Sequence, residues 1–332
     1  MKILGLVLVG LVLRFANSQP VRLERYNVDR NHISVSGISS GAAMAVQLHV
    51  AFSHTFRGVG TFAGVPYFCA QGSALDAINV CMDAPQSINV GELITEASDA
   101  ANNGRIDSTN GLLQDRVYMY HGAVDDVVLP AAVEKVQEFY NNYGGNTRVQ
   151  LITDGGHGMP TDNYGNSCSS SSSPYINNCG VNGAFECLNH IHGNIQAPSA
   201  TLNGVFQEYQ QTEFAPGTDS FESAGFMYVP SRCVDQTRAC KLHIALHGCL
   251  QGREEVGDVY ARNAGYNEVA ESNDIIVLYP QLRADTLLGN PNGCWDWWGY
   301  EDNAFFPLEY HVRVGPQMAA VKNMLDRVVG TN

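Results

Sequence analysis

The alternation of apolar and polar residues in the first half of the chain predicts three strands. Residues 33–36 alternate before a glycine, and residues 117–120 and 149–152 are also typical of strands. Residues 41–52 are almost all small or apolar, which predicts a buried helix directly after the first strand, and residues 131–140 predict a second helix. Strands that alternate with helices favour an α/β fold, with a mostly parallel sheet and helices on both faces.

The second half of the chain continues this pattern. Residues 225–230 and 241–246 are expected to form two paired strands, and the apolar run 275–279 fits a buried parallel strand. Residues 314–329 form an amphipathic pattern that predicts a closing helix. Residues 160–180 are polar and serine-rich between cysteines, which predicts a long surface loop held by a disulfide.

The beginning of the chain has the pattern of a secretory signal peptide. Lys2 precedes an apolar run over 3–13, and residues 16–18 are a small-residue cleavage site. The run has about 11 residues, against roughly 20 for a membrane span, and no later stretch is long and apolar enough to span a bilayer. We therefore expect residues 1–18 to be removed and residues 19–332 to form one secreted domain.

The charge of the chain limits the partners that it can bind. The formal net charge is −14, and removal of Lys2 and Arg14 with the signal peptide makes it −16. A chain this acidic repels phosphate backbones, so we expect no nucleic-acid partner. Only 16% of the residues are charged and 33 are glycine, which favours a turn-rich secreted enzyme over a disordered chain.

Nine cysteines behind a signal peptide predict disulfides, because the secretory route is oxidising. Their spacing suggests four pairs: Cys69 with Cys81, Cys168 with Cys179, Cys233 with Cys240, and Cys249 with Cys294. Cys187 is left over in an apolar segment that looks helical, which favours a buried, inert thiol over an intermolecular disulfide. His190 and His192 have no cysteine or carboxylate at ligand spacing, so no metal site is predicted.

Three short motifs carry the candidate chemistry. Ser39 is the centre of a G-x-S-x-G motif, and Asp125 and His157 follow it, each just after a predicted strand. The order Ser, Asp, His is that of an α/β-hydrolase triad. A serine hydroxyl needs a base to become a nucleophile. His157 would take the proton from Ser39, and Asp125 would orient the imidazole.

Two other residues compete for the acid and base roles. Asp126 is adjacent to Asp125, but the spacing His-Gly-x-x-Asp after the strand favours Asp125. His247 is the main rival of His157, but its Leu-His-Gly-Cys context fits an oxyanion-hole loop better.

The oxyanion hole needs two backbone N–H donors. We expect one from Ser40, the residue after the nucleophile, and the other from Cys249, in a loop that a disulfide to Cys294 would hold rigid. In an α/β-hydrolase this His-Gly loop precedes the nucleophile, whereas here it follows about two hundred residues later. The order therefore predicts a circularly permuted α/β-hydrolase fold.

The segment 292–300 holds all three tryptophans of the chain. At least one of them is expected in the core, and the cluster also suggests the wall of a cleft that suits apolar acyl chains or polyester segments. Phe305 and Phe306 continue the aromatic character.

Four motifs together resemble those of the secreted polyhydroxybutyrate depolymerases, in the single-domain branch with a circularly permuted catalytic domain. They are G-I-S-S-G-A at 37–42, A-G-V-P-Y-F-C-A at 63–70, L-H-G-C-x-Q at 246–251 and N-G-C-W-D-W-W-G-Y at 292–300. The resemblance runs from about residue 26 to the C-terminus, and four motifs in order are highly specific.

The resemblance implies the same site residues as the motifs do. The nucleophile falls on Ser39, the acid on Asp125, the base on His157, and the oxyanion donors on Ser40 and Cys249. Members of the family also have an aromatic residue in the cleft near the last motif. Because no tryptophan follows Trp298, Phe306 is the candidate for that role, and Trp298 is a second candidate for substrate binding.

The leading hypothesis is a secreted, monomeric serine esterase that cleaves short-chain 3-hydroxyalkanoate polyesters or their oligomers without cofactor or metal. A feruloyl or acetyl esterase that acts on polysaccharide esters or small esters is the alternative, because the triad cannot separate the two. A secreted binding protein that has lost catalysis is a third hypothesis from a different class.

Overall fold

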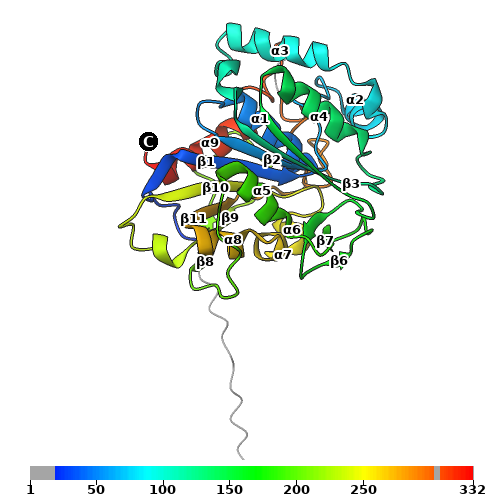
Figure 1. Cartoon of the computed structure of the whole chain (residues 1–332). Helices are drawn as coiled ribbons and strands as arrows, with labels where there is room; N and C mark the ends of the chain where they lie inside the picture. Colours follow the sequence, from blue (N-terminus) through cyan, green and yellow to red (C-terminus); the bar gives the residue numbers. More distant parts are fainter. Residues whose placement is uncertain (1–18, 303–306, 332) are drawn as a thin grey trace, which may run out of the picture.

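The computed structural model describes residues 19–302 and 307–331. The predicted signal peptide 1–18 and the candidate residue Phe306 lie outside the described residues. An eight-stranded sheet crosses the molecule, with helices on both of its faces (Figure 1). From one edge to the other the strands are β4 (Asn146–Ile152), β3 (Arg116–Gly122), β2 (Gly58–Phe62), β1 (Val28–Ile38), β10 (Cys240–Leu246), β11 (Ile275–Tyr279), β9 (Ala224–Val229) and β8 (Val205–Gln210).

The sheet is mostly parallel, as predicted. The six strands from β4 to β11 pair in parallel, and β9 and β8 are added antiparallel at one edge. The prediction that residues 225–230 and 241–246 pair with each other is wrong, because β11 lies between β9 and β10. A hydrophobic pattern identifies a strand, but both neighbours of β10 are parallel strands that reach it through long crossovers.

The two faces of the sheet bury separate apolar clusters. Along β3, Val117 and Met119 belong to one cluster, whereas Tyr118 and Tyr120 belong to the other, because successive side chains point to opposite faces. The first face is covered by α1 (Ser40–Ala51), α3 (Val90–Asn102), α4 (Ala131–Asn142) and α9 (Pro316–Val329). The second is covered by α5 (Gly183–His192), α7 (Val259–Asn263) and α8 (Tyr266–Asn273).

Helix α1 confirms the helix predicted over residues 41–52. Every residue of α1 is buried, which its small and apolar sequence permits. Helices α4, α5 and α9 confirm the other helical patterns. Two short helices, α2 (Ala74–Asp76) and α6 (Arg253–Val256), lie in loops.

The position of β10 establishes the circular permutation. β10 lies beside β1 in the sheet, although about two hundred residues separate the two in the chain. The end of the last helix also lies against the beginning of β1, since the N–H of Tyr26 donates to the carbonyl of Val328 at 2.8 Å. The strand order is thus that of a circularly permuted α/β-hydrolase.

The segment predicted as a surface loop over residues 160–180 is only partly irregular. It contains most of a second, three-stranded parallel sheet made of β5 (Met159–Thr161), β7 (Ile176–Asn178) and β6 (Asn166–Ser167). Strands of two or three residues are too short for an alternating pattern to show in the sequence.

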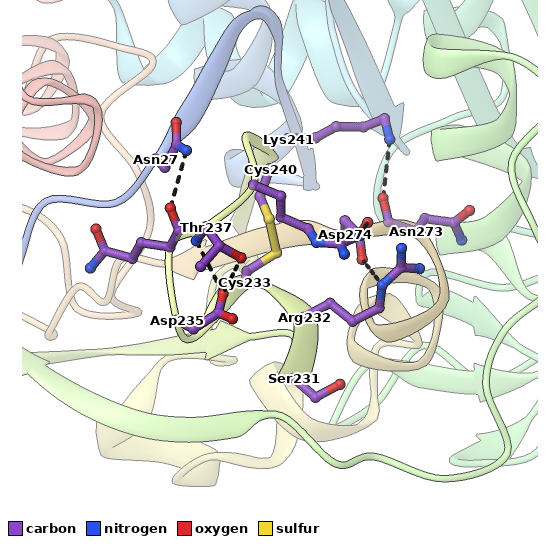
Figure 2. The surroundings of a disulfide bond; sticks show 12 residues. Asn27, Ser231, Arg232, Cys233, Asp235, Thr237, Cys240, Lys241, Asn273 and Asp274 are labelled. Carbon is purple, nitrogen blue, oxygen red and sulfur yellow. Dashed lines mark hydrogen bonds and ion pairs between the residues drawn. A yellow bond between two sulfur atoms is a disulfide. The ribbon is translucent and has the colours of Figure 1, made fainter.

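All four predicted disulfides are present, and Cys187 is a free, buried thiol. Figure 2 shows Cys233–Cys240, which closes the turn between β9 and β10. Beside it, the carboxylate of Asp274 forms an ion pair with Arg232 at 3.5 Å (Figure 2) and a second one with Arg238 at 3.2 Å. Within the described residues, none of the helices combines the length and apolar character that crossing a membrane requires.

Candidate active site

The loops that carry the predicted site residues meet at the carboxyl edge of the sheet. Backbone hydrogen bonds connect these segments: the N–H of Val124, next to Asp125, donates to the carbonyl oxygen of Gly155, two residues before His157, at 3.0 Å, and the N–H of Ser39 donates to the carbonyl oxygen of Phe62, at the end of β2, at 2.8 Å. The carboxyl ends of parallel strands are where open α/β sheets bind their ligands. Ser39, Asp125 and His157 therefore follow β1, β3 and β4 at the expected edge.

Ser39 occupies a sharp turn between β1 and α1. Its φ of 56° and ψ of −122° lie in a region that non-glycine residues rarely adopt, and such conformations cluster at functional sites. The turn needs glycine on both sides of Ser39, because a Cβ on Gly37 would lie 2.2 Å from the carbonyl oxygen of Gly41. Ser40 is the first residue of α1, where an N–H has no partner within the helix.

Asp125 and His157 are buried and hydrogen-bonded to each other. The Nδ1 of His157 donates to Oδ2 of Asp125 at 2.8 Å, while Oδ1 accepts the N–H groups of Val127 and Val128 at 2.9 and 3.0 Å. Burial alone would raise the pKa of Asp125, but the hydrogen bond from His157 and the backbone donors lower it below its usual value. The carboxylate therefore stays ionised and fixes the tautomer with Nδ1 protonated.

The second ring nitrogen of His157 is open. Within residues 19–302 and 307–331, no group is hydrogen-bonded to its Nε2. The N–H of His157 donates to Oγ of Ser171 at 3.1 Å, and the ring of Tyr175 lies edge-on to the imidazole with centroids 6.2 Å apart. The backbone and ring of His157 are thus held, while one nitrogen can accept a proton.

His121 is a member of the site that the sequence analysis did not single out. It is fully buried, its Nε2 lies 3.6 Å from Oδ2 of Asp125, and it donates from Nε2 to the carbonyl of Val128 at 2.7 Å. Burial lowers the pKa of His121, so the ring is neutral. This bond closes the turn that carries Asp125. The His-Gly-x-x-Asp spacing was the signal that could have pointed to it.

The two rival residues do not fit the acid and base positions. Asp126 is exposed on the surface. Both nitrogens of His247 are occupied, since Nδ1 donates to the carbonyl of Gly248 at 2.7 Å and Nε2 accepts the N–H of Leu282 at 3.1 Å. Burial lowers the pKa of His247 to about 4, so it is a neutral structural residue.

The Leu-His-Gly-Cys loop lies against the nucleophile turn. A Cβ on Gly41 would be 2.3 Å from the carbonyl oxygen of His247, and a Cβ on Gly248 would be 3.3 Å from the Cβ of Ser39. The bond from His247 holds the Gly248 carbonyl. Because the peptide is planar and trans, the N–H of Cys249 must point the opposite way. The Cys249–Cys294 disulfide, with Cα atoms 4.3 Å apart, holds the same loop.

The three tryptophans divide between core and surface. Trp295 is fully buried next to the ring of His247, and Trp297 is also buried, whereas Trp298 is partly exposed and contacts the ring of Tyr300. Burial raises the pKa of the neighbouring Asp296 to about 7, although three backbone N–H groups donate to it. Trp298 remains a predicted substrate contact.

Comparison with known proteins agrees with this geometry. Residues 21–179 match the model of the prolyl oligopeptidase family. The chain is 37% identical over 345 residues to the polyhydroxybutyrate depolymerase of Talaromyces funiculosus, which covers 99% of this chain and 97% of that protein. It is 40% identical over 314 residues to the poly(3-hydroxybutyrate) depolymerase of Delftia acidovorans, which covers 93% of this chain but 62% of that protein, so this chain spans about three-fifths of its length.

Two solved structures of PHB depolymerases are also similar to this chain. The crystal structure of a PHB depolymerase from Penicillium funiculosum superposes with a TM-score of 0.86 at 35% identity, covering 93% of this chain and 99% of that one. A serine-to-alanine variant of a PHB depolymerase, in complex with an R3HB trimer, superposes with a TM-score of 0.85. Fold and site thus define a carboxylic ester hydrolase with a circularly permuted α/β-hydrolase fold. The chain belongs to the polyhydroxybutyrate depolymerase family.

Proposed function

We propose that the protein hydrolyses the ester bonds of poly(3-hydroxybutyrate)-like polyesters or their oligomers through an acyl-enzyme. The observation that carries the proposal is the 2.8 Å bond between Asp125 and His157, at the sheet edge where Ser39 occupies its strained turn. The substrates in the names of the similar depolymerases support the choice of ester.

The residues have distinct roles in this reaction. Nε2 of His157 takes the proton of the Ser39 hydroxyl while Oγ attacks the ester carbonyl, and Asp125 stabilises the imidazolium. The N–H groups of Ser40 and Cys249 stabilise the oxyanion of the tetrahedral intermediate. His157 then returns the proton to the departing hydroxyl of the 3-hydroxyacyl chain. Water activated by the same imidazole releases the acid and restores Ser39.

The surface around this edge suits an apolar polymer. Leu75, Ile78, Val124 and Leu287 are between 50% and 98% exposed, and they lie on segments that follow β2, β3 and β11 at their carboxyl ends. Exposed aliphatic side chains near a site are typical of a surface that binds apolar partners. A neutral, apolar polyester fits such a face better than a charged substrate does.

The disulfides also bear on where the enzyme acts, and we propose its oligomeric state as well. Four disulfides fit an oxidising compartment, so we propose that residues 1–18 direct secretion and that the domain over 19–332 acts outside the cell as a monomer.

A second candidate substrate class has some support. A protein of Aspergillus terreus named "Probable acetylxylan esterase A" and the acetylxylan esterase A of Emericella nidulans are 29% and 27% identical to this chain over 35% of its length. Acetyl or feruloyl esters of polysaccharides would use the same triad. The choice between the two substrate classes therefore depends on the side chains that face the acyl and alcohol parts of the ester.

The test is turnover of dispersed amorphous poly(3-hydroxybutyrate), p-nitrophenyl butyrate and methyl ferulate, with Ser39→Ala as the matched variant. Clearing of the polymer by the wild type and its loss in Ser39→Ala is the expected result. Turnover of the small esters without clearing would move the substrate to the second class. If no ester is cleaved, and a fluorophosphonate does not label Ser39, the protein is a binding protein and the proposal is wrong.

A further inference from the structure

Gln251 ends the Leu-His-Gly-Cys-x-Gln segment, and its side chain connects two loops of the site. The residue is 1% exposed, and its Oε1 accepts the N–H of Gly248 at 2.8 Å. Its Nε2 donates to the carbonyl oxygens of Pro174 and Tyr175 at 3.0 and 3.1 Å. A glutamine amide offers one carbonyl and two N–H groups, so each has a partner and the amide has a single orientation.

The first loop, residues 247–251, is called the oxyanion loop here. Gly248 lies against Ser39, and the peptide that follows Gly248 carries the N–H of Cys249. The carbonyl oxygen of Gly248 accepts a hydrogen bond from Nδ1 of His247 at 2.7 Å, and the N–H of Gly248 donates to Oε1 of Gln251. Both hydrogen-bonding groups of Gly248 are therefore fixed by side chains, and these fix the direction of the Cys249 N–H.

The second loop, residues 168–175, is called the base loop. It holds His157 from two sides, since Oγ of Ser171 accepts the N–H of His157 at 3.1 Å and the ring of Tyr175 packs against the imidazole. The two bonds of Gln251 to this loop span 77 and 76 residues of sequence. They join a loop that follows β10 to a loop beside the small sheet of β5, β7 and β6.

We propose that Gln251 is a positioning residue, which sets the distance between the oxyanion donor Cys249 and the base His157. This inference rests on the proposed function. Gln251 does not touch the reacting atoms. It acts through Gly248 on one side and through Tyr175 on the other. The oxyanion donors and the base must act on the same ester group at the same time. A misplacement of one of them by about 1 Å can lower the rate about 100-fold.

The main test is Gln251→Met, which keeps the length and volume of the side chain and removes all three hydrogen bonds. We expect kcat for p-nitrophenyl butyrate to fall about 10- to 100-fold, while KM changes less than about threefold, because the interaction serves the transition state. The affinity for an alkyl boronic acid, which forms a tetrahedral adduct with the serine, should fall by a factor similar to that of kcat/KM.

Asn273 provides the matched control. It ends α8, directly before the amino end of β11, and so lies at the other ends of the strands from the site. Its Oδ1 accepts the N–H of Gln196 at 2.7 Å, and its Nδ2 donates to Gln196 and Val269 at 2.9 and 2.8 Å. Asn273→Leu removes the same number of bonds from a buried amide. We expect it to lower Tm, as Gln251→Met also does, but to leave kcat and boronate affinity per folded molecule unchanged.

Gln251→Glu is the second variant, in case the methionine variant does not fold. It keeps an acceptor for the N–H of Gly248 but loses both donors to the base loop, so a similar loss of kcat is expected. Wild-type kcat and boronate affinity in either folded Gln251 variant would overturn the inference, as would a loss confined to Tm or KM. A wild type that cleaves no ester would overturn the proposed function, and the inference with it.

Discussion

Strand β3 has an Asp–His pair at each of its ends, and the two pairs differ in what holds the second ring nitrogen of the histidine. At the carboxyl end, Asp125 accepts Nδ1 of His157 at 2.8 Å. At the amino end, Asp115 accepts Nε2 of His49 at 3.2 Å. Both histidines are buried, so neither the partners nor the burial separates the two pairs.

The second ring nitrogen separates them. Nδ1 of His49 accepts the hydroxyl of Tyr140 at 3.0 Å, so the whole imidazole is used inside the core. The Nε2 of His157 has no partner in the described part of the chain, and it lies at the edge where Ser39 and the oxyanion loop meet. A pair can thus act as a base only where one nitrogen is left open beside a nucleophile. His49 and Ser39 belong to the same turn–helix unit, but they lie at its opposite ends.

Asp125→Asn is the variant for which we expect the largest effect. The amide cannot stabilise an imidazolium and favours the wrong tautomer of His157, so we expect kcat for p-nitrophenyl butyrate to fall about 10⁴-fold. Steady-state kinetics, with circular dichroism to establish the fold, would measure the effect.

Asp115→Asn is the matched control for this experiment. It makes the same chemical change at the other end of β3, and kcat should stay within about twofold of the wild type because the surface of the site is unchanged. Equal losses of kcat in the two variants would show that the Asp125 effect is structural.

The second prediction concerns the core pair itself. His49→Leu leaves the buried carboxylate of Asp115 and the hydroxyl of Tyr140 without partners, so we expect the free energy of unfolding to fall by roughly 3 kcal/mol. Chemical denaturation would measure this fall, and kcat per folded molecule should not change. A large loss of kcat at full occupancy of the folded state would mean that the two pairs are coupled through α1.

The chain order and the local sequence patterns are enough to predict that Asp125 and His157 form a pair. The alternating segments at 117–120 and 149–152 correspond to β3 and β4, and the motifs at their ends place Asp125 and His157. The turn around Ser39 is also visible in the sequence, because only glycine fits at the close approaches of Gly37 and Gly41. The four disulfides follow from the spacing of the cysteines in a chain whose first residues predict secretion.

The remaining features depend on contacts that no local pattern contains. Strand β2 was missed because two of its five residues are glycine, which weakens a strand pattern. The wrong pairing of β9 with β10 arose because neighbours in a sheet are set by crossovers and not by the strands themselves. The role of Gln251 depends on carbonyl groups more than 70 residues away.

The third prediction concerns His247, a buried histidine that has no carboxylate partner. His247 is held by a carbonyl oxygen and an N–H, and burial lowers its pKa to about 4. In the unfolded chain a histidine takes a proton below about pH 6.5. The unfolded state therefore binds more protons between these two values, and stability must fall as the pH falls through that window.

The measurement is urea unfolding of the wild type and of His247→Gln at pH 7, 6 and 5. From pH 7 to pH 5 the wild type should lose roughly 2 kcal/mol more than the variant, because only the wild type carries this titrating group. The buried histidines His192 and His243 titrate in both chains and cancel in the difference. A difference that stays constant over this range would mean that His247 is protonated in the folded state, in which case it could not accept the N–H of Leu282. The oxyanion loop would then be held in another way.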